Sequence, residues 1–186
     1  MKSKSAIWRL VLFSLVFASS SDGLFSNDRY DRLIRSASER YFGMESDWRW
    51  HKARIYVESR FNVKAVSPVG AAGIAQFMSE TAMDYGARSP ADRFDPEWSI
   101  NAMVHYIKDI WTLLESARPD GTNVAAIDRE RLADASYNAG QGRILKALKK
   151  YGYSWKTIKP HIPSETQSYS ERIQSQKQIY MGIKNE

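Results

Sequence analysis

The chain has 186 residues, of which 43% are hydrophobic and 26% charged, and it contains no Cys. This length and composition are typical of one globular domain that buries enough surface to fold without cross-links. The lack of Cys excludes disulfides, thiolate nucleophiles and Cys-based zinc or iron–sulfur sites. His51, His105 and His161 are too widely spaced to form a paired metal-ligand motif. We therefore expect neither a metal ion nor a cofactor.

The formal net charge is +6, and part of it belongs to the first 20 positions, which hold Lys2, Lys4 and Arg9 and no acidic residue. The rest of the chain is only mildly basic. This charge suits a polyanionic partner, but it does not single out nucleic acid.

The first 20 residues have the pattern of a secretory signal peptide. A basic start is followed by a short apolar run at positions 10–18 and by small residues. The run is shorter than the roughly 20 apolar residues of a membrane-spanning helix. We expect residues 1–20 to be a signal peptide, 21–27 a flexible lead-in and 28–186 the mature domain. An uncleaved anchor or a buried helix at 1–20 remains the alternative.

Apolar residues recur at helical spacing along most of the remaining chain. The first helix covers residues 30–41 and ends at Gly43, and the second covers 46–59. A third begins at Asp95-Pro96, where a capping side chain precedes a proline, and continues to about residue 114.

Three further helices are predicted in the C-terminal part. Two cover 128–138 and 142–150, separated by Gly140 and Gly142, and the last begins at Ser164 with Gln167 completing a capping box. Gly and Pro residues indicate loops with short helical turns over 60–94, and no period-2 pattern predicts a sheet. The predicted fold is a mainly α single domain with a Gly-rich loop region.

The aromatic and basic residues have structural interpretations as well as functional ones. Three tryptophans on predicted helix stripes are expected in the core: Trp48, Trp98 and Trp111. Four lysines flank the aromatic residues at 151, 153 and 155: Lys146, Lys149, Lys150 and Lys156. Such a run is typical of a solvated face, and the alternative is a surface that meets anionic stem peptides or teichoic acids.

Glu58 is the strongest candidate for chemistry because it lies at the predicted end of a helix, directly before the Gly-rich loop. Aliphatic and aromatic neighbours remove water from a carboxyl group and favour its protonated form, which a general acid requires. Arg54 and Arg60 would favour the ionised form instead. The residues alone leave this competition open.

The pattern around Glu58 resembles the signature of the lytic transglycosylases. Glu58-Ser59 is followed by the segment 67–78, in which Ala75 departs from the usual Gly-Leu-Met-Gln pattern. Ser79, directly after Met78, departs from the usual Met-Pro pair. Asp95-Pro96, the run 136–140 (Ser-Tyr-Asn-Ala-Gly) and the run 164–166 (Ser-Glu-Thr) are similar to later motifs of that family. All four matches occur in family order between about residues 28 and 180.

The resemblance implies a lysozyme-like domain with a Gly-rich loop region beside an active-site cleft. It also implies cleavage of the β-1,4 bond between N-acetylmuramic acid and N-acetylglucosamine in peptidoglycan, with 1,6-anhydro product ends. By position, Glu58 matches the family's single catalytic acid and base. By the same resemblance, Ser67 is expected to orient Glu58 through a hydrogen bond. The remaining positions are expected to contact substrate: Ser59, Gln76, Met78, Tyr137, Asn138, Glu165 and Tyr169.

Other interpretations remain open at this point. A goose-type muramidase would share the fold and deliver water, and a wall-binding module would have lost cleavage. We expect an exported, periplasmic or envelope protein that is a monomer and binds peptidoglycan glycan strands. A cell-wall or secretion-machinery partner is compatible with this view, whereas nucleic acid and a permanent membrane span are not expected.

Overall fold

The computed structural model describes residues 28–119, 121 and 124–183. The predicted signal peptide (1–20) and lead-in (21–27) lie outside the described residues. None of the described helices is both long enough and apolar enough to cross a membrane.

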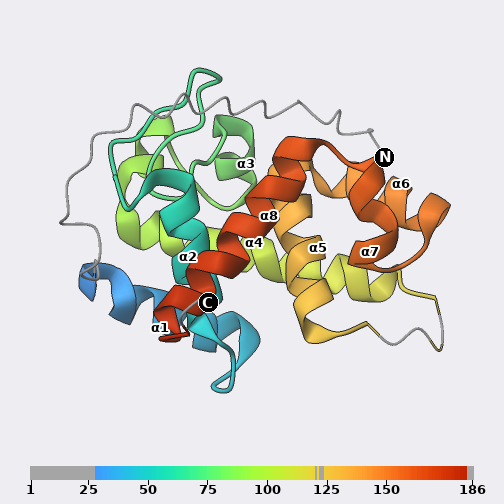
Figure 1. The fold of residues 1–186 in the computed structure, drawn as a ribbon. Helices are drawn as coiled ribbons and strands as arrows, with labels where there is room; N and C mark the ends of the chain where they lie inside the picture. The colour runs from blue at the N-terminus through green and yellow to red at the C-terminus, as the bar shows by residue number, and fades with distance from the viewer. Residues whose placement is uncertain (1–27, 120, 122–123, 184–186) are drawn as a thin grey trace. The chain divides into compact units, whose positions relative to one another are not determined.

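The described chain is built from helices, which confirms the prediction of a mainly α fold (Figure 1). Its β structure is limited, among the described residues, to two isolated bridges, Val66↔Ala72 and Ala72↔Phe77. The elements in chain order are η1 (Asp28–Tyr30), α1 (Asp31–Phe42), α2 (Trp48–Ser59), α3 (Ser79–Asp84), η2 (Pro90–Phe94), α4 (Pro96–Ser116), α5 (Ala126–Ala139), α6 (Gln141–Tyr151), α7 (Trp155–Ile158), η3 (Lys159–His161) and α8 (Ser164–Tyr180).

The described residues form two compact units whose division falls inside α4, between Val104 and His105. The first unit comprises residues 28–104 and the second comprises the described residues of 105–183. Each unit has its own buried side chains.

In the first unit, α1 packs against α2. Helix α1 ends as predicted at Gly43, which has φ +90° and donates its N–H to the Glu39 carbonyl at 3.0 Å. Helix α2 begins after Asp47, whose side chain accepts a hydrogen bond from the Arg49 N–H at 3.2 Å. The ammonium of Lys52 on α2 lies 2.7 Å from the Asp31 carboxylate on α1, which joins the two helices.

The rest of this unit consists of the Gly-rich segment (residues 60–78), α3, η2 and the start of α4. Helix α4 begins as predicted, because the Asp95 carboxylate accepts the Glu97 N–H at 2.9 Å. The side chains at the centre of this unit are fully buried apolar groups: Ile34, Ile55, Ile74, Phe77, Ile100 and Met103. The Gly-rich segment therefore contributes to the core of the unit.

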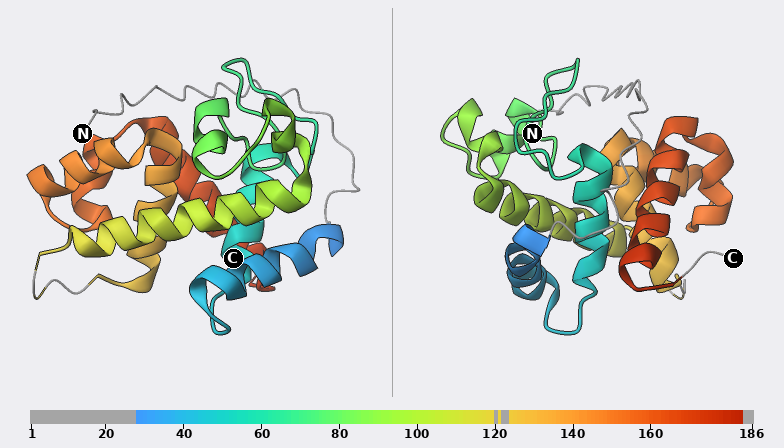
Figure 2. Two further views of the ribbon diagram at one scale, coloured as in Figure 1. Left: turned by 180° about the vertical axis from the view of Figure 1, so that it is seen from behind. Right: turned by 60° about the vertical axis from the view of Figure 1, so that its left-hand side comes forward.

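In the second unit, α5 packs against both α6 and α8, and Figure 2 shows α5 and α8 side by side in both views. Helix α5 has an almost continuous run of buried residues from Leu132 to Asn138. Helix α6 instead has one buried face, formed by Ile144, Ala147 and Leu148. This difference places α5 inside the unit and α6 at its surface.

Two local predictions are wrong. Gly142 lies inside α6 and does not separate two helices, because Gly140 alone, with φ +89°, ends α5. Helix α8 does begin at Ser164, but Pro163 occupies the cap position and no side chain caps the helix there. The Gln167 amide donates to the Ile162 carbonyl at 3.0 Å instead of completing a capping box.

The predicted tryptophan core is also corrected. Trp48, Trp98 and Trp111 are half-buried, whereas the buried tryptophans are Trp50 and Trp155. The ring faces of two of the half-buried residues lie under guanidinium groups, with Arg35 at 4.0 Å from the Trp48 centroid and Arg129 at 5.4 Å from the Trp111 centroid. Their helix stripes therefore meet cationic side chains as well as apolar ones.

Candidate functional site

Glu58 lies in the last turn of α2 and is only 8% exposed. The helix ends immediately after it, because Arg60 adopts a left-handed conformation with φ +50° and Phe61 continues it with φ +64°. These two residues turn the chain away from the helix axis. The carboxyl group is thus carried on a rigid helix at the point where the chain enters the Gly-rich segment.

The position of Glu58 on its helix also has an electrostatic consequence. The C-terminal end of a helix carries about half a negative charge. Burial and a nearby negative potential both disfavour an ionised carboxylate. Both features act on the Glu58 carboxyl group, and the fully buried Arg54 lies one turn earlier on the same helix.

The end of α2 is fastened to the Gly-rich segment by Ser59. The Ser59 hydroxyl donates to the Ile74 carbonyl at 2.8 Å, and both residues are buried. Ser59, the residue after Glu58, therefore fixes the Gly-rich segment to the end of α2 through its side chain.

Ser67 begins a tight turn within this segment. Its hydroxyl accepts the Ala71 N–H at 3.0 Å, and its own N–H donates to the Ala71 carbonyl at 2.8 Å. Gly70 completes the turn with φ +84° and donates its N–H to the Ser67 carbonyl at 2.9 Å. The side chain of Ser67 is buried and fixes the shape of the turn.

Gln76 and Met78 lie at the other end of the segment. Gln76 is 1% exposed with φ +51°, and its amide nitrogen donates to the Gly73 carbonyl at 2.9 Å and to the Ala65 carbonyl at 3.2 Å. Met78 is half-buried at the position that precedes α3. Of these two predicted contact residues, Met78 has the more accessible side chain.

Arg93, on η2, is a residue of this site that the sequence did not reveal. Its guanidinium donates to the Gly70 carbonyl at 2.8 Å, to the Phe77 carbonyl at 3.0 Å and, within its own helix, to the Pro90 carbonyl at 3.0 Å. The first two acceptors are Gly70, in the turn that begins at Ser67, and Phe77, directly before Met78 at the end of the Gly-rich segment. Because they are 23 and 16 residues away in sequence, no local pattern indicates the interaction.

The remaining predicted residues lie in the second unit on α5 and α8. The hydroxyl of Thr166 donates to the Asn138 side-chain oxygen at 2.8 Å, which joins the end of α5 to the start of α8. Tyr137 and Tyr169 are buried, whereas Glu165, in the first turn of α8, is half-exposed. The packed helix pair therefore gathers all four predicted residues of this unit.

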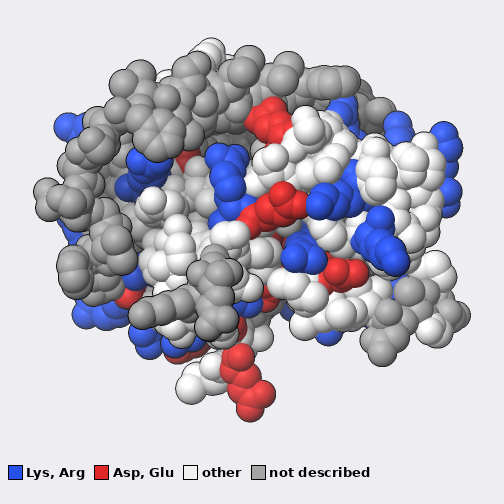
Figure 3. All heavy atoms as spheres, in the orientation of Figure 1, with Lys and Arg blue, Asp and Glu red and all other residues white. Residues whose placement is uncertain are grey.

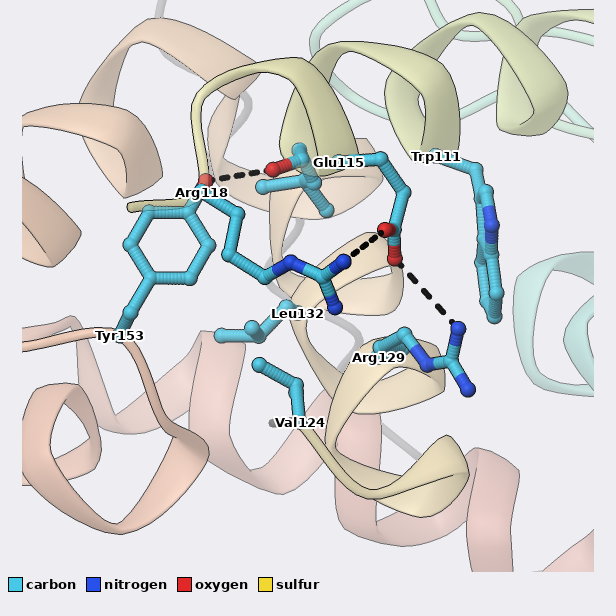
Figure 4. Close-up of a pocket in the computed structure, with 8 residues that line it drawn as sticks. Trp111, Glu115, Arg118, Val124, Arg129, Leu132 and Tyr153 are labelled. Carbon is cyan, nitrogen blue, oxygen red and sulfur yellow. Dashed lines mark hydrogen bonds and ion pairs between the residues drawn. The ribbon is translucent and has the colours of Figure 1, made fainter. Parts of the chain in front are cut away.

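A separate small pocket lies in the second unit and contains none of the predicted site residues (Figure 4). Glu115 lines this pocket and forms ion pairs with Arg118 at 3.2 Å and with Arg129 at 3.5 Å. Burial, followed by the negative charge of Glu115, raises the pKa of Tyr153 above its usual value of 10.0. Over the described part of the chain, no group of three or more His, Asp or Glu residues is placed to hold a metal ion.

The chain is similar to several known proteins. The Transglycosylase SLT domain family matches residues 33–162. The chain is 34% identical over 140 residues to the membrane-bound lytic murein transglycosylase F of Shewanella frigidimarina, covering 72% of this chain and 27% of that protein. It is also 34% identical over 128 residues to the protein of the same name from Vibrio cholerae, covering 66% of this chain and 22% of that protein.

Solved structures show the same fold. The 70 kDa soluble lytic transglycosylase of Escherichia coli matches with a TM-score of 0.64 and 29% identity, covering 82% of this chain and 24% of that chain. An inactive mutant of the lytic transglycosylase Slt from Pseudomonas aeruginosa matches with a TM-score of 0.66 and 22% identity, covering 86% of this chain and 25% of that chain. This second likeness concerns the fold alone.

The chain spans only about a quarter of the length of the relatives and structures that it matches. Within that span, the matched residues 33–162 include Glu58, the Gly-rich segment and the end of α5. The lysozyme-like fold predicted from the motifs is confirmed by the structural match. The chain therefore belongs to the Transglycosylase SLT domain family.

Proposed function

We propose that this protein is a peptidoglycan lytic transglycosylase in which Glu58 is the single catalytic acid and base. It would cleave the β-1,4 bond between N-acetylmuramic acid and N-acetylglucosamine. The observation that carries the proposal is the buried Glu58 in the last turn of α2, next to Ser59, whose hydroxyl bonds to the Gly-rich segment, in a chain of this family. The predicted signal peptide supports export to the cell envelope.

The proposal of a single catalytic carboxyl group is supported by the surroundings of the other acidic residues. Glu58 and Asp134 are the two buried carboxylate residues among the described part of the chain. Asp134 accepts hydrogen bonds from Gln174 at 3.2 Å and Ser170 at 3.5 Å, so it serves the packing of α5 on α8. On α3, which follows the Gly-rich segment, Glu80 and Asp84 are both exposed. An ordinary glycosidase would need a second carboxyl group beside the bond that is cleaved.

In the proposed reaction, protonated Glu58 first donates its proton to the glycosidic oxygen as the bond to C1 of N-acetylmuramic acid breaks. The C1 centre acquires oxocarbenium character or is assisted by the substrate's own acetamido group. Ionised Glu58 then takes the proton of the C6 hydroxyl of the same sugar, and that oxygen bonds to C1. The 1,6-anhydro ring closes, Glu58 regains its proton, and no water is consumed.

We assign the other predicted site residues to two roles according to whether their side chains are accessible or buried. Met78 and Glu165 keep accessible side chains and are proposed to touch the glycan directly. Ser59, Ser67 and Gln76 are proposed to shape the segment beside Glu58 through the hydrogen bonds described above. Three buried residues at the end of α5 and on α8 are proposed to shape the wall on which the sugar rests: Tyr137, Asn138 and Tyr169.

Mass spectrometry of a peptidoglycan digest tests the proposal. The wild-type protein should release fragments with 1,6-anhydro ends, and Glu58→Gln should keep the fold but lose product formation by about 10²–10⁴-fold, the usual size of a general acid–base contribution. The matched control is Glu80→Gln, which makes the same chemical change at an exposed site and should retain wild-type turnover.

Three other outcomes would contradict the proposal. Fragments heavier by one water would show hydrolysis by a muramidase. Binding to peptidoglycan without any product from the wild-type protein would indicate a wall-binding module. Normal release of anhydro fragments by Glu58→Gln would show that another group supplies the proton.

A further inference from the structure

The surface formed by α6, α7 and η3 carries basic residues without acidic ones. From position 135 to position 164 the chain contains no Asp or Glu, and it contains six cations: Arg143, Lys146, Lys149, Lys150, Lys156 and Lys159. Figure 3 shows Lys and Arg gathered over the α6 and α7 edge of the molecule. We call the exposed part of this region the lysine surface and define it by Lys146, Lys149, Lys150, Lys156, Tyr151 and His161.

Helical geometry places three of the lysines on one face. Helix α6 buries Ile144, Ala147 and Leu148, and positions 146, 149 and 150 project from the opposite side at 3.6 residues per turn. All three lysines are exposed, as is Lys156 on α7. The ammonium groups therefore extend into solvent together.

An exposed aromatic pair adjoins these lysines. The rings of Tyr151 and His161 are stacked, with centroids 3.6 Å apart and planes inclined by 11°. Tyr151 is 36% exposed, and the Lys150 ammonium lies 5.0 Å from its ring centroid. The stack fixes η3 against the end of α6 and gives the lysine surface a rigid apolar edge.

Within the described part of the chain, the four lysines of the lysine surface have no counter-charge. Lys159 pairs with Glu171, but Lys146, Lys149, Lys150 and Lys156 form no ion pair with any residue in the described ranges. A lysine pair at i and i+4, as at 146 and 150, weakens a helix. Lys149 and Lys150 gain from the negative end of the α6 dipole, but this gain does not account for Lys146 or Lys156.

Charge complementarity indicates an anionic polymer as the partner. Lysine ammonium groups are mobile point charges that suit separate carboxylates at variable spacing. In peptidoglycan, the stem peptides carry such carboxylates at regular intervals, whereas the glycan strand bears few charges. We propose that the lysine surface binds the stem-peptide carboxylates of peptidoglycan. This inference rests on the proposed function for the identity of the polymer.

Such binding would hold the enzyme on the wall between cleavage events. A second contact on the same polymer raises the effective concentration of the glycan at the catalytic unit. Because the contacts are exposed charges, binding should weaken as the salt concentration rises. The lysine surface takes no part in the reaction itself, and turnover of short, peptide-free glycans should not depend on it.

Sedimentation with purified insoluble sacculi tests the inference. All proteins carry Glu58→Gln so that the sacculi are not digested during the measurement. The test variant replaces the four lysines of the surface together: Lys146→Gln, Lys149→Gln, Lys150→Gln and Lys156→Gln. The control makes the same change in net charge at exposed cations elsewhere: Arg32→Gln, Lys64→Gln, Arg88→Gln and Arg172→Gln.

At low salt, the test variant should bind sacculi at least about fivefold more weakly than the parent, given that each exposed charge pair contributes modestly, and the control should bind nearly as the parent does. The difference should disappear on glycan strands stripped of peptides by an amidase. If the fourfold variant unfolds by circular dichroism, Lys146→Gln with Lys156→Gln, which leaves the last turn of α6 intact, should show a smaller loss of the same kind.

Equal binding by the test and control variants would overturn the inference, as would a loss that persists on stripped glycan. A loss of binding to DNA without a loss on sacculi would assign the surface to nucleic acid instead. These results are separate from the product assay. Absence of anhydro products with a lysine-dependent binding loss would refute the proposed reaction alone, whereas normal products with no binding loss would refute the lysine surface alone.

Discussion

Gly73 is the position in the Gly-rich segment at which a single added methyl group should be most harmful. A Cβ added to Gly73 would lie 1.6 Å from the Arg93 carbonyl oxygen, far inside any permitted contact, and the residue has φ +78°. The same carbonyl accepts a hydrogen bond from the Ser99 hydroxyl at 2.9 Å. Gly73→Ala must therefore displace the Arg93 carbonyl group, which the Ser99 hydroxyl holds in place.

The magnitude follows from two contributions. The left-handed conformation costs a residue with a Cβ about 1–2 kcal/mol, and forcing extra volume into a packed region costs about 1–3 kcal/mol more. Gly73→Ala should lower the free energy of unfolding by about 2–5 kcal/mol. Gly70 offers a matched control, because it has φ +84° but a Cβ added there would meet nothing within 4 Å. Gly70→Ala should cost only the first contribution, about 1–2 kcal/mol.

Urea denaturation followed by circular dichroism measures both variants, with the free energy in water obtained by linear extrapolation. The comparison is direct because alanine lowers the entropy of the unfolded chain equally at both positions. Gly73→Ala should be less stable than Gly70→Ala by about 1–3 kcal/mol. Equal losses would refute the close approach of the Gly-rich segment to η2.

Two further predictions concern the dependence of stability on pH. The pKa of Asp92 is lowered from 3.8, first by the Arg88 N–H and then by the hydroxyl and N–H of Ser89, so its stabilisation is present above pH 3.8 and is lost as the pH falls through the lower folded-state value. Asp92→Asn should lower stability at neutral pH and flatten the acid limb of a stability–pH curve, and an unchanged acid limb would contradict this. Burial, reinforced by Glu115, raises the pKa of Tyr153 above 10.0, so its stabilisation is present below pH 10.0 and is lost as the pH rises through the higher folded-state value. Tyr153→Phe should remove the hydrogen bond to the Leu114 carbonyl (2.6 Å) and lower the free energy of unfolding by about 0.5–1.5 kcal/mol at neutral pH. It should also reduce the loss of stability that denaturation measures above pH 10.0. A loss of stability as steep as in the wild type would count against this prediction.

Elements with local signals were predictable from the sequence. The end of α1 at Gly43 and the start of α4 after Asp95 each depend on one residue and its immediate neighbours. The capping box at Ser164 failed because Pro163 takes the cap position and Gln167 reaches the Ile162 carbonyl. A pattern of residue types predicts that a cap is available, but the path of the preceding chain decides whether it is used.

In the candidate site, too, local motifs were visible in the sequence, whereas long-range contacts were not. The motifs led to the proposal of Glu58 and its segment as the candidate site, but they did not indicate how the segment is held. Arg93 acts on carbonyls 16 and 23 residues away, and Thr166 acts on Asn138 at a separation of 28 residues. Interactions of this kind arise only after the chain has folded, so spacing along the sequence carries no trace of them.

The Gly-rich segment shows why these distant side chains are required. It is buried at Ile74, Ala75 and Phe77, yet it has no regular strand or helix to satisfy its carbonyl groups, and buried backbone groups without partners are costly. Side-chain donors supplement its few backbone hydrogen bonds, with Ser59 at Ile74, Gln76 at Ala65 and Gly73, and Arg93 at Gly70 and Phe77. The carbonyl groups of Ala65, Gly73 and Phe77 also accept backbone N–H groups within the segment. A general acid must be held in position within a fraction of an ångström to be effective. In the proposed reaction, polar residues beside Glu58 would therefore support catalysis without touching the sugar, because they hold an irregular segment rigidly.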